Sequence, residues 1–196
     1  MHERVSSVED TANIMFDRLV HAGISPVDEE FVNLALQGAR DVFDCTAQAL
    51  ADGTLTLADL YDDNYVEIEG SNPPRYRNRA VTWTDANWRP IFDRVKASHP
   101  AVMGSVCMDW NGYLPAHLSE RSRKPTGNRE HDGEFCRNGL LFADLKNRYR
   151  NPGSEYTMGA YRYSIDDKTY SVVRVVYVPL IFDGRRWGEF NVNYAR

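Results

Sequence analysis

The chain has 196 residues, of which 42% are hydrophobic and 26% charged, a composition that is typical of a folded globular protein and excludes general disorder. Its formal net charge of -5 argues against nucleic acid as the main partner, because phosphate binding requires a concentrated basic face. No stretch approaches the roughly 20 apolar residues of a membrane-spanning helix, and the start lacks the apolar run of a signal peptide, so we expect a cytoplasmic protein with no membrane insertion.

The first quarter of the chain is predicted to be helical. Apolar residues at steps of three and four indicate a helix over residues 5–21, and Ser25-Pro26 starts a second helix that runs to Gly53. We expect the apolar stripe of these helices to face the domain or a second copy of the chain, and we favour pairing between protomers for residues 5–21. The stripe consists of Val8, Met15, Leu19, Phe31, Leu34 and Val42.

Helix is also predicted between residues 56 and 97. Thr56 opens a short helical turn, and the turn-rich segment 61–75 leads into a longer helix over 76–97. Because Pro90 removes one backbone donor from that helix, we expect a kink or a restart there.

After Pro100 the apolar pattern changes from the helical period to the two-residue period of strands. Asn-Gly at 111–112 and Asp-Gly at 183–184 are favourable turns between alternating stretches, and a short helix over 135–144 is predicted between the second and third strands. The predicted strands are 101–108, 113–117, 156–164, 169–181 and 186–194.

Helices followed by five short antiparallel strands make an α+β architecture with the element order of a PAS-like fold. We expect residues 1–55 to form an N-terminal helical extension with a role in dimerisation, and residues 56–196 to form the sheet domain.

Basic residues concentrate between positions 121 and 150, where eight Lys or Arg stand against four Asp or Glu, a local charge of +4 in an acidic chain. A guanidinium pairs with a carboxylate through two hydrogen bonds, so such a segment lying over a sheet is able to fix a small anionic group. Loop charges that face water are the plainer alternative.

Aromatic residues on the predicted strands, with a few polar anchors, describe a small-ligand pocket, although they describe a sheet core equally well. A charge in the middle of a strand, such as Arg174, either needs a partner on a core face or points outward. The candidate ligand-binding residues are Tyr113, His117, Arg137, Tyr161 and Arg174.

The three cysteines, Cys45, Cys107 and Cys136, stand at wide spacing without a CxxC pair, and we expect them to be reduced, buried thiols. The histidines show neither HxxxH nor HExxH spacing, and the chain has no GxSxG, P-loop or GxGxxG motif. The sequence therefore predicts neither a metal site nor catalytic residues, and we expect a protein that is not an enzyme.

Five stretches occur in one order along the chain and together suggest a family. They resemble the C-terminal sensory segment that follows the signalling hairpin in many bacterial methyl-accepting chemotaxis proteins, over about residues 36–196. The stretches are NPPRYRNR (72–79), MDWNGYLPAH (108–117), CRNGLLFAD (136–144), GAYRY (159–163) and VPLIFDGRRWGEFNVNY (178–194).

The resemblance implies a PAS/Cache-like ligand-binding or redox-sensing domain of a chemotaxis or related pathway, with a signalling protein as its partner. The chain departs from the family pattern at Leu118, where an asparagine is usual, and at Arg174-Val175, where a Lys-Asp pair is usual. Only about 35 residues precede the similar region, so we expect a free-standing module that acts through dimerisation or by docking on another protein.

These observations predict a cytoplasmic sensory module that binds a small polar or anionic ligand between the sheet and residues 119–150. Its occupancy would pass to a partner through the N-terminal helices. One alternative is a haem or flavin redox sensor with His117 or Cys136 as axial ligand, and another is a small α+β enzyme of unknown reaction.

Overall fold

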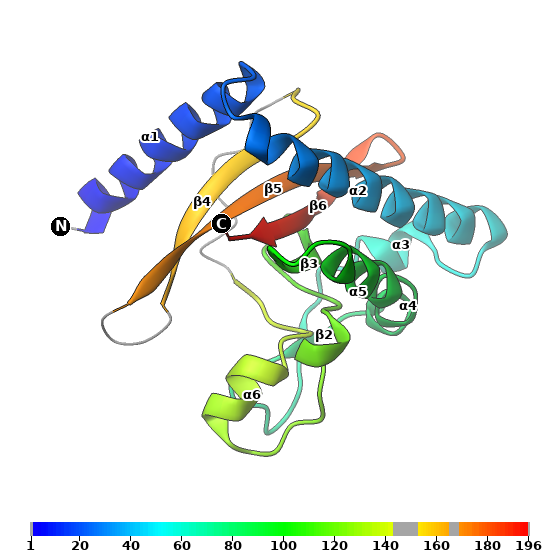
Figure 1. The fold of residues 1–196 in the computed structure, drawn as a ribbon. Helices are drawn as coiled ribbons and strands as arrows, with labels where there is room; N and C mark the ends of the chain where they lie inside the picture. Colours follow the sequence, from blue (N-terminus) through cyan, green and yellow to red (C-terminus); the bar gives the residue numbers. More distant parts are fainter. Residues whose placement is uncertain (1, 143–152, 165–168, 196) are drawn as a thin grey trace.

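The computed structural model describes residues 2–142, 153–164 and 169–195, and it has the expected α+β architecture. Helices cover one face of a four-stranded antiparallel sheet, and a long segment carrying one short helix lies against the other face (Figure 1). No helix in the described part of the chain combines the length and the apolar character that crossing a membrane requires. The helices are α1 (His2–His21), α2 (Pro26–Asp52), α3 (Leu57–Leu60), α4 (Val81–Asn87), α5 (Arg89–Ser98) and α6 (Arg129–Phe135), with a 3-10 turn at Ser119–Arg121.

The main sheet has the strand order β3-β6-β5-β4, and each neighbouring pair is antiparallel. Asp183 and Gly184 join β5 to β6 with φ values of 51° and 71°, which suit the tight turn of a two-residue hairpin. A separate small sheet pairs β1 with β2. The strands are β1 (Val66–Glu67), β2 (Tyr76–Arg77), β3 (Val102–Asp109), β4 (Thr157–Ser164), β5 (Tyr170–Phe182) and β6 (Arg185–Tyr194).

The predicted strand over residues 113–117 is wrong, and the main sheet therefore has four strands and not five. After the turn that follows β3 the chain leaves the sheet and pairs with a later segment. The Leu114 N–H donates to the Leu140 carbonyl at 2.9 Å, and the Leu114 carbonyl accepts from the Gly139 N–H at 2.7 Å. These bonds hold the segment over the sheet rather than within it.

Helix boundaries follow local signals in most places. α2 begins at Pro26, and it ends where Gly53 takes a left-handed conformation with φ 78°. The single helix predicted over 76–97 is instead β2 followed by α4 and α5, and the two helices meet at Trp88, shortly before Pro90.

The short helix expected over residues 135–144 lies earlier, at α6, and residues 143 and 144 fall outside the described part of the chain. The Asn128 side chain accepts hydrogen bonds from the Glu130 and His131 N–H groups, which caps the first turn of α6. This cap begins a helix inside a stretch whose polar composition indicated a loop.

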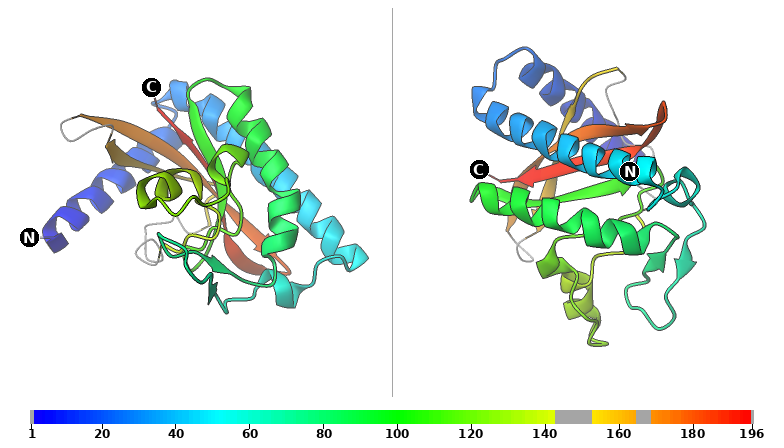
Figure 2. Two further views of the ribbon diagram at one scale, coloured as in Figure 1. Left: turned by 90° about the horizontal axis from the view of Figure 1, so that it is seen from below. Right: turned by 90° about the vertical axis from the view of Figure 1, so that its right-hand side faces the viewer.

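The helices α2 and α5 pack on the sheet around one hydrophobic core. Phe31 from α2, Phe92 from α5 and Phe190 from β6 are each exposed by 1% or less. Trp88 is fully buried in the same core, and its indole N–H donates to the Thr46 hydroxyl at 3.0 Å. Figure 2 shows α2 running along the sheet from two further directions, with the N-terminal end of α1 projecting beyond it.

Helix α1 lies along the edge of the sheet at β4. The buried Asp17 carboxylate accepts a hydrogen bond from the Met158 N–H at 2.7 Å, and the Asn13 side-chain oxygen accepts from the Ala160 N–H at 2.8 Å. α1 thus satisfies backbone donors of an edge strand that are otherwise open to pairing with another chain.

The predicted apolar stripe is divided between the core and solvent. On α2, Phe31 and Val42 are buried and Leu34 is half-buried. On α1, Met15 and Leu19 are 60% and 46% exposed, and the side chain at position 8 lies outside the described residues. Pairing of α1 between two copies of the chain stays a prediction.

Replacing Gly38 of α2 by alanine should destabilise the fold, because a Cβ there would lie 2.6 Å from Cε1 of Phe190 and 3.2 Å from Cγ2 of Val95. Overpacking outweighs the helix propensity of alanine, so we expect a net loss of about 1–2 kcal/mol in urea unfolding. Gly133→Ala in α6 is the matched control, since its Cβ would meet only Pro73 Cδ, at 3.9 Å, and should keep or raise stability. Equal effects of the two substitutions would contradict the packing described here.

Candidate ligand-binding site

A cavity of about 360 Å³ lies between the sheet face that points away from α2 and residues 113–142, which we call the covering segment. We call this cavity the sheet pocket, and its volume suits a small molecule. The strands line it with residues that include Val106, Met108, Tyr161, Tyr163, Tyr177, Asn191 and Asn193, and the covering segment contributes Leu114, His117, Arg121, Arg137 and Phe142.

The two-residue period of strands explains why polar side chains of β6 share the pocket face. Phe190, Val192 and Tyr194 turn toward the helices and are fully buried in the core. Asn191 and Asn193 alternate with them and line the pocket. Two amides between three core residues therefore mark the pocket face of this strand.

A glycine on β4 shapes the wall of the pocket. A Cβ at Gly159 would lie 2.9 Å from Cε2 of Tyr177, so only glycine lets the Tyr177 ring lie against β4 without displacement. The ring then forms part of the pocket wall above the strand.

One end of the sheet pocket is basic. Arg121 pairs with Glu134 at 3.2 Å, whereas Arg137 has no carboxylate partner among the described residues. The Nε of Arg137 is shielded from solvent and has no hydrogen-bond partner in the described part of the chain. Burial, followed by the charge of Arg121, lowers the pKa of the Arg137 guanidinium, which remains a cation because arginine stays protonated in proteins.

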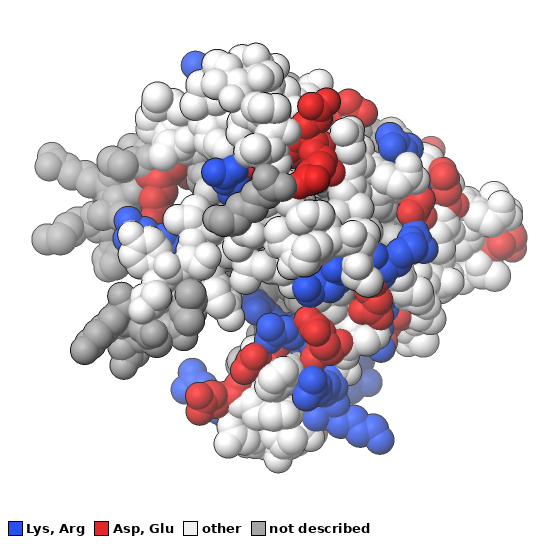
Figure 3. All heavy atoms as spheres, viewed as in Figure 1, with Lys and Arg blue, Asp and Glu red and all other residues white. Residues whose placement is uncertain are grey.

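The covering segment carries charges of both signs. Among residues 121–142 five Lys or Arg stand against three Asp or Glu. Figure 3 shows basic and acidic side chains interleaved around the α6 region. Apart from Arg137, which lines the pocket, the segment therefore holds four Lys or Arg against three Asp or Glu, and these charges offset one another.

His117 lies beside the arginines as a neutral ring. Its Nδ1 accepts a hydrogen bond from the Leu118 N–H at 2.8 Å, so the proton of the neutral imidazole resides on Nε2. Burial, and then the charges of Arg137 and Arg121, lower its pKa to about 3. At neutral pH the ring thus offers the pocket an uncharged N–H donor.

Asn191 presents an unpartnered acceptor. The residue is 5% exposed, and its Oδ1 has no hydrogen-bond partner in the described part of the chain. The neighbouring Asn193 accepts from the Tyr161 hydroxyl at 3.4 Å. Buried amide oxygens are nearly always hydrogen-bonded in folded proteins, so the bare Oδ1 of Asn191 marks a place for a ligand or water.

The structure brings three of the five predicted site residues, His117, Arg137 and Tyr161, to the sheet pocket. Tyr113 does not line it: the ring is fully buried beside Tyr65, and its hydroxyl donates to the Tyr76 carbonyl at 2.9 Å. Tyr113 therefore anchors the covering segment instead of contacting the pocket.

Arg174 lies on the opposite face of the sheet. Its Nη1 donates to the buried carboxylate of Asp28, at the start of α2, at 2.7 Å, and the Tyr194 hydroxyl donates to the same oxygen at 2.6 Å. Burial raises the pKa of Asp28, but hydrogen bonds from Ser25, Tyr194 and Arg174 outweigh it and leave the pKa below its ordinary value. The role of Arg174 is thus to tie α2 to the sheet.

Sequence reasoning missed the two asparagines of β6. The available signal was their alternation with Phe190, Val192 and Tyr194, which places them on the face opposite the core. Because their amides carry no charge, the charged residues nearby were the stronger candidates for a binding site.

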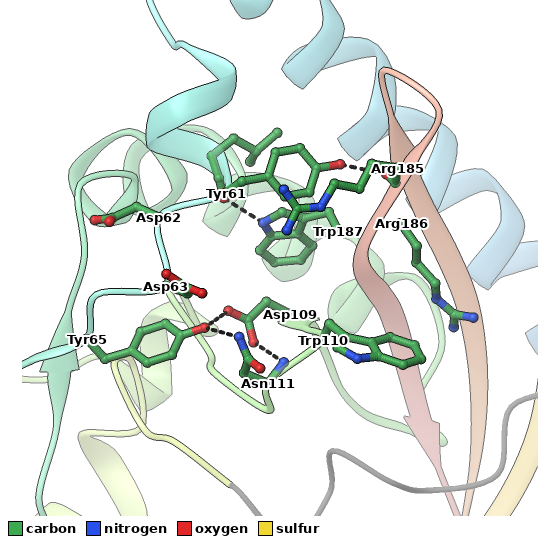
Figure 4. A pocket seen from close by; sticks show the side chains of 11 residues that line it. Tyr61, Asp62, Asp63, Tyr65, Asp109, Trp110, Asn111, Arg185, Arg186 and Trp187 are labelled. Carbon is green, nitrogen blue, oxygen red and sulfur yellow. Dashed lines mark hydrogen bonds between the residues drawn. The ribbon is translucent and has the colours of Figure 1, made fainter.

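A second hollow, of about 390 Å³, lies between the turn after β3 and the β5–β6 hairpin (Figure 4). Its half-buried carboxylate, Asp109, accepts hydrogen bonds from the Tyr65 hydroxyl, the Asn111 N–H and the Tyr113 N–H. Burial raises the pKa of Asp109, and these donors counteract that effect. Because the hollow's own residues satisfy this carboxylate, it is the weaker candidate for a ligand site.

One group of side chains has the composition of a metal site. Ligand atoms of His131, Asp132 and Cys136 lie within 4.8 Å of one another. However, the Asp132 carboxylate already accepts from the Thr126 N–H, the Thr126 hydroxyl and the Gly127 N–H, with the first of these lowering its pKa most. Asp132 therefore clamps the loop to α6, and we assign no metal here.

Neither proposed haem ligand has the form that haem ligation requires. An axial histidine usually donates its Nδ1 proton and binds iron through Nε2, whereas Nδ1 of His117 is an acceptor and Nε2 carries the proton. The Cys136 thiol donates to the Arg123 carbonyl at 3.2 Å, and burial raises its pKa, so it is not a thiolate.

Comparison with known proteins identifies no relative: no family model, curated protein or solved structure matches this chain. We therefore infer the function of the protein from the geometry of the site.

Stability should fall as the pH drops below about 6.5, because an unfolded His117 takes up a proton there while the folded ring, with a pKa of about 3, does not. Between pH 6.5 and 5.0 this group alone should reduce the free energy of unfolding by about 2 kcal/mol. His117→Asn keeps an acceptor for the Leu118 N–H and removes the titration, so its urea-unfolding stability should change less over the same interval. Identical pH slopes for the two proteins would show that His117 is not held neutral.

Proposed function

We propose that this protein is a small-molecule-binding sensory module whose ligand is an anion held in the sheet pocket. The observation that carries the proposal is the Arg137 guanidinium, whose solvent-shielded Nε has no partner and which has no carboxylate beside it among the described residues. A half-buried cation that forms no ion pair is stabilised when an anion binds beside it. A carboxylate suits the planar guanidinium and the adjacent N–H donor of His117.

The same residues favour binding over catalysis. A general acid–base pair requires groups that exchange protons near neutral pH. In the sheet pocket His117 stays neutral, Arg137 stays charged, and none of the described lining residues is Asp or Glu. These features support a binding protein rather than an enzyme.

A route from the pocket to the N-terminal helices exists in β6. Asn191 and Asn193 face the pocket, while Tyr194 on the other face hydrogen-bonds to Asp28 at the start of α2. A ligand that shifts β6 therefore acts on the anchor of α2. This connection supports an output through α1 and α2 to a signalling partner.

The sequence resemblance to the sensory segments of chemotaxis receptors agrees with this reading. We propose a cytoplasmic, PAS/Cache-like role in chemotaxis-type signalling, with a homodimer formed through α1. The exposed side chains of Met15 and Leu19 support that use of α1. A haem sensor is less well supported, because Nε2 of His117 and the thiol of Cys136, the atoms that would bind iron, both carry a proton.

Phenylacetate and benzoate are suitable probes, and isothermal titration calorimetry measures their affinity. Arg137→Gln should weaken binding of both by about tenfold or more, since a charged hydrogen bond is lost, while the melting temperature stays equal or rises. Arg94→Gln is the matched control: it removes an exposed ion pair with Asp41, and neither residue lines the sheet pocket, so the affinity should not change.

Two results would sink the proposal. The first is the absence of any melting-temperature increase across a panel of carboxylates and other small anions. The second is anion binding that Arg137→Gln leaves unchanged. The first would favour a purely protein-binding role, and the second would place the anion site away from Arg137.

A further inference from the structure

The sheet pocket contains two unsatisfied groups of opposite kinds. Arg137 offers a solvent-shielded N–H donor, and Asn191 offers an acceptor oxygen that is equally shielded, and neither has a hydrogen-bond partner in the described part of the chain. A simple anion satisfies the first group and leaves the second bare. A ligand that matches both must carry an anionic acceptor and, elsewhere on the molecule, a hydrogen-bond donor.

The charge around the pocket determines what kind of donor fits. Arg121 and Arg137 both line it, and none of its described lining residues is Asp or Glu. An ammonium group would enter a buried site next to two guanidinium groups without a counter-ion, which is unfavourable through both desolvation and repulsion. A hydroxyl group donates to Asn191 without that penalty.

The rest of the pocket wall is apolar, which favours a ligand with an apolar body. Val106, Met108 and Leu114 form a small hydrophobic cluster against which Phe142 packs, and all four line the pocket. Burying hydrocarbon against such a wall is favourable, and aromatic rings fit well between sulfur-containing and aromatic side chains.

We propose that the sheet pocket selects hydroxycarboxylates with an apolar, preferably aromatic, body and discriminates against the corresponding amino acids. The carboxylate binds Arg137, the hydroxyl donates to Oδ1 of Asn191, and the ring lies against the hydrophobic cluster. This inference rests on the proposed function, because it assumes that the pocket binds anions, and it goes further by naming the ligand class.

Three acids with one skeleton test the inference on the full chain. Phenylacetate, mandelate and phenylglycine carry hydrogen, hydroxyl and ammonium at the same carbon, and the pair benzoate and 4-hydroxybenzoate places the hydroxyl at a greater distance. In at least one of these series the hydroxy acid should bind about threefold or more tightly than its parent by calorimetry at pH 7. Phenylglycine should bind more weakly than phenylacetate.

The variant Asn191→Leu, close to asparagine in shape, should abolish the gain from the hydroxyl and keep the affinity of the parent acid. A circular dichroism melt verifies that the variant is folded. The comparison of the acids on the wild-type protein tests the inference independently of this variant. Arg137→Gln should weaken every acid in the panel.

The outcomes separate the two levels of the argument. If the parent acids bind through Arg137 but neither hydroxy acid gains affinity, or if phenylglycine binds as tightly as mandelate, the ligand class is wrong and the anion-binding function stands. If no acid binds at millimolar concentration, the proposed function fails, and the present inference fails with it.

Discussion

Alternation along β6 is the constraint on which the rest of the structure depends. Phe190, Val192 and Tyr194 form part of the core beneath the helices, so Asn191 and Asn193 must face the other side. A one-residue change of register would place the amides in the core and the aromatic rings outside it. The division of the molecule into a helical layer for stability and a polar pocket face follows from this pattern.

The pocket exists because the covering segment is held over the polar face at fixed points. The Tyr76 N–H donates to the Gly139 carbonyl at 2.7 Å, and the Tyr113 hydroxyl donates to the Tyr76 carbonyl at 2.9 Å. Gly139 has φ 85°, and a Cβ there would lie 2.5 Å from the Tyr76 oxygen, so glycine is required. The small β1–β2 sheet therefore holds the covering segment in place. These contacts keep Arg137 of that segment above the strands.

Much of the fold could be predicted from the sequence, and the failures have physical reasons. Gly53 and the Asp183-Gly184 turn mark element ends because their backbone conformations favour these residue types. The face of Arg174 could not be predicted, since both of its neighbours, Val173 and Val175, are themselves buried. A sheet covered on both faces loses the contrast between apolar and polar positions, and only the partner, Asp28 in a distant helix, decides the direction of the arginine.

In the sensory role that we propose, transmission from the pocket to the helices would be limited by the energy that the ligand supplies. The backbone of β6 connects Asn191 on one face with Tyr194 and its bond to Asp28 on the other. A ligand biases the position of α2 only to the extent that it binds one arrangement of β6 better than another. In this proposal the unsatisfied groups of Arg137 and Asn191 would provide that difference, because one molecule has to reach both of them. Under the same proposal, a ligand that engages Arg137 alone would bind without contacting β6 through Asn191, and occupancy and signalling would then not follow the same order among anions.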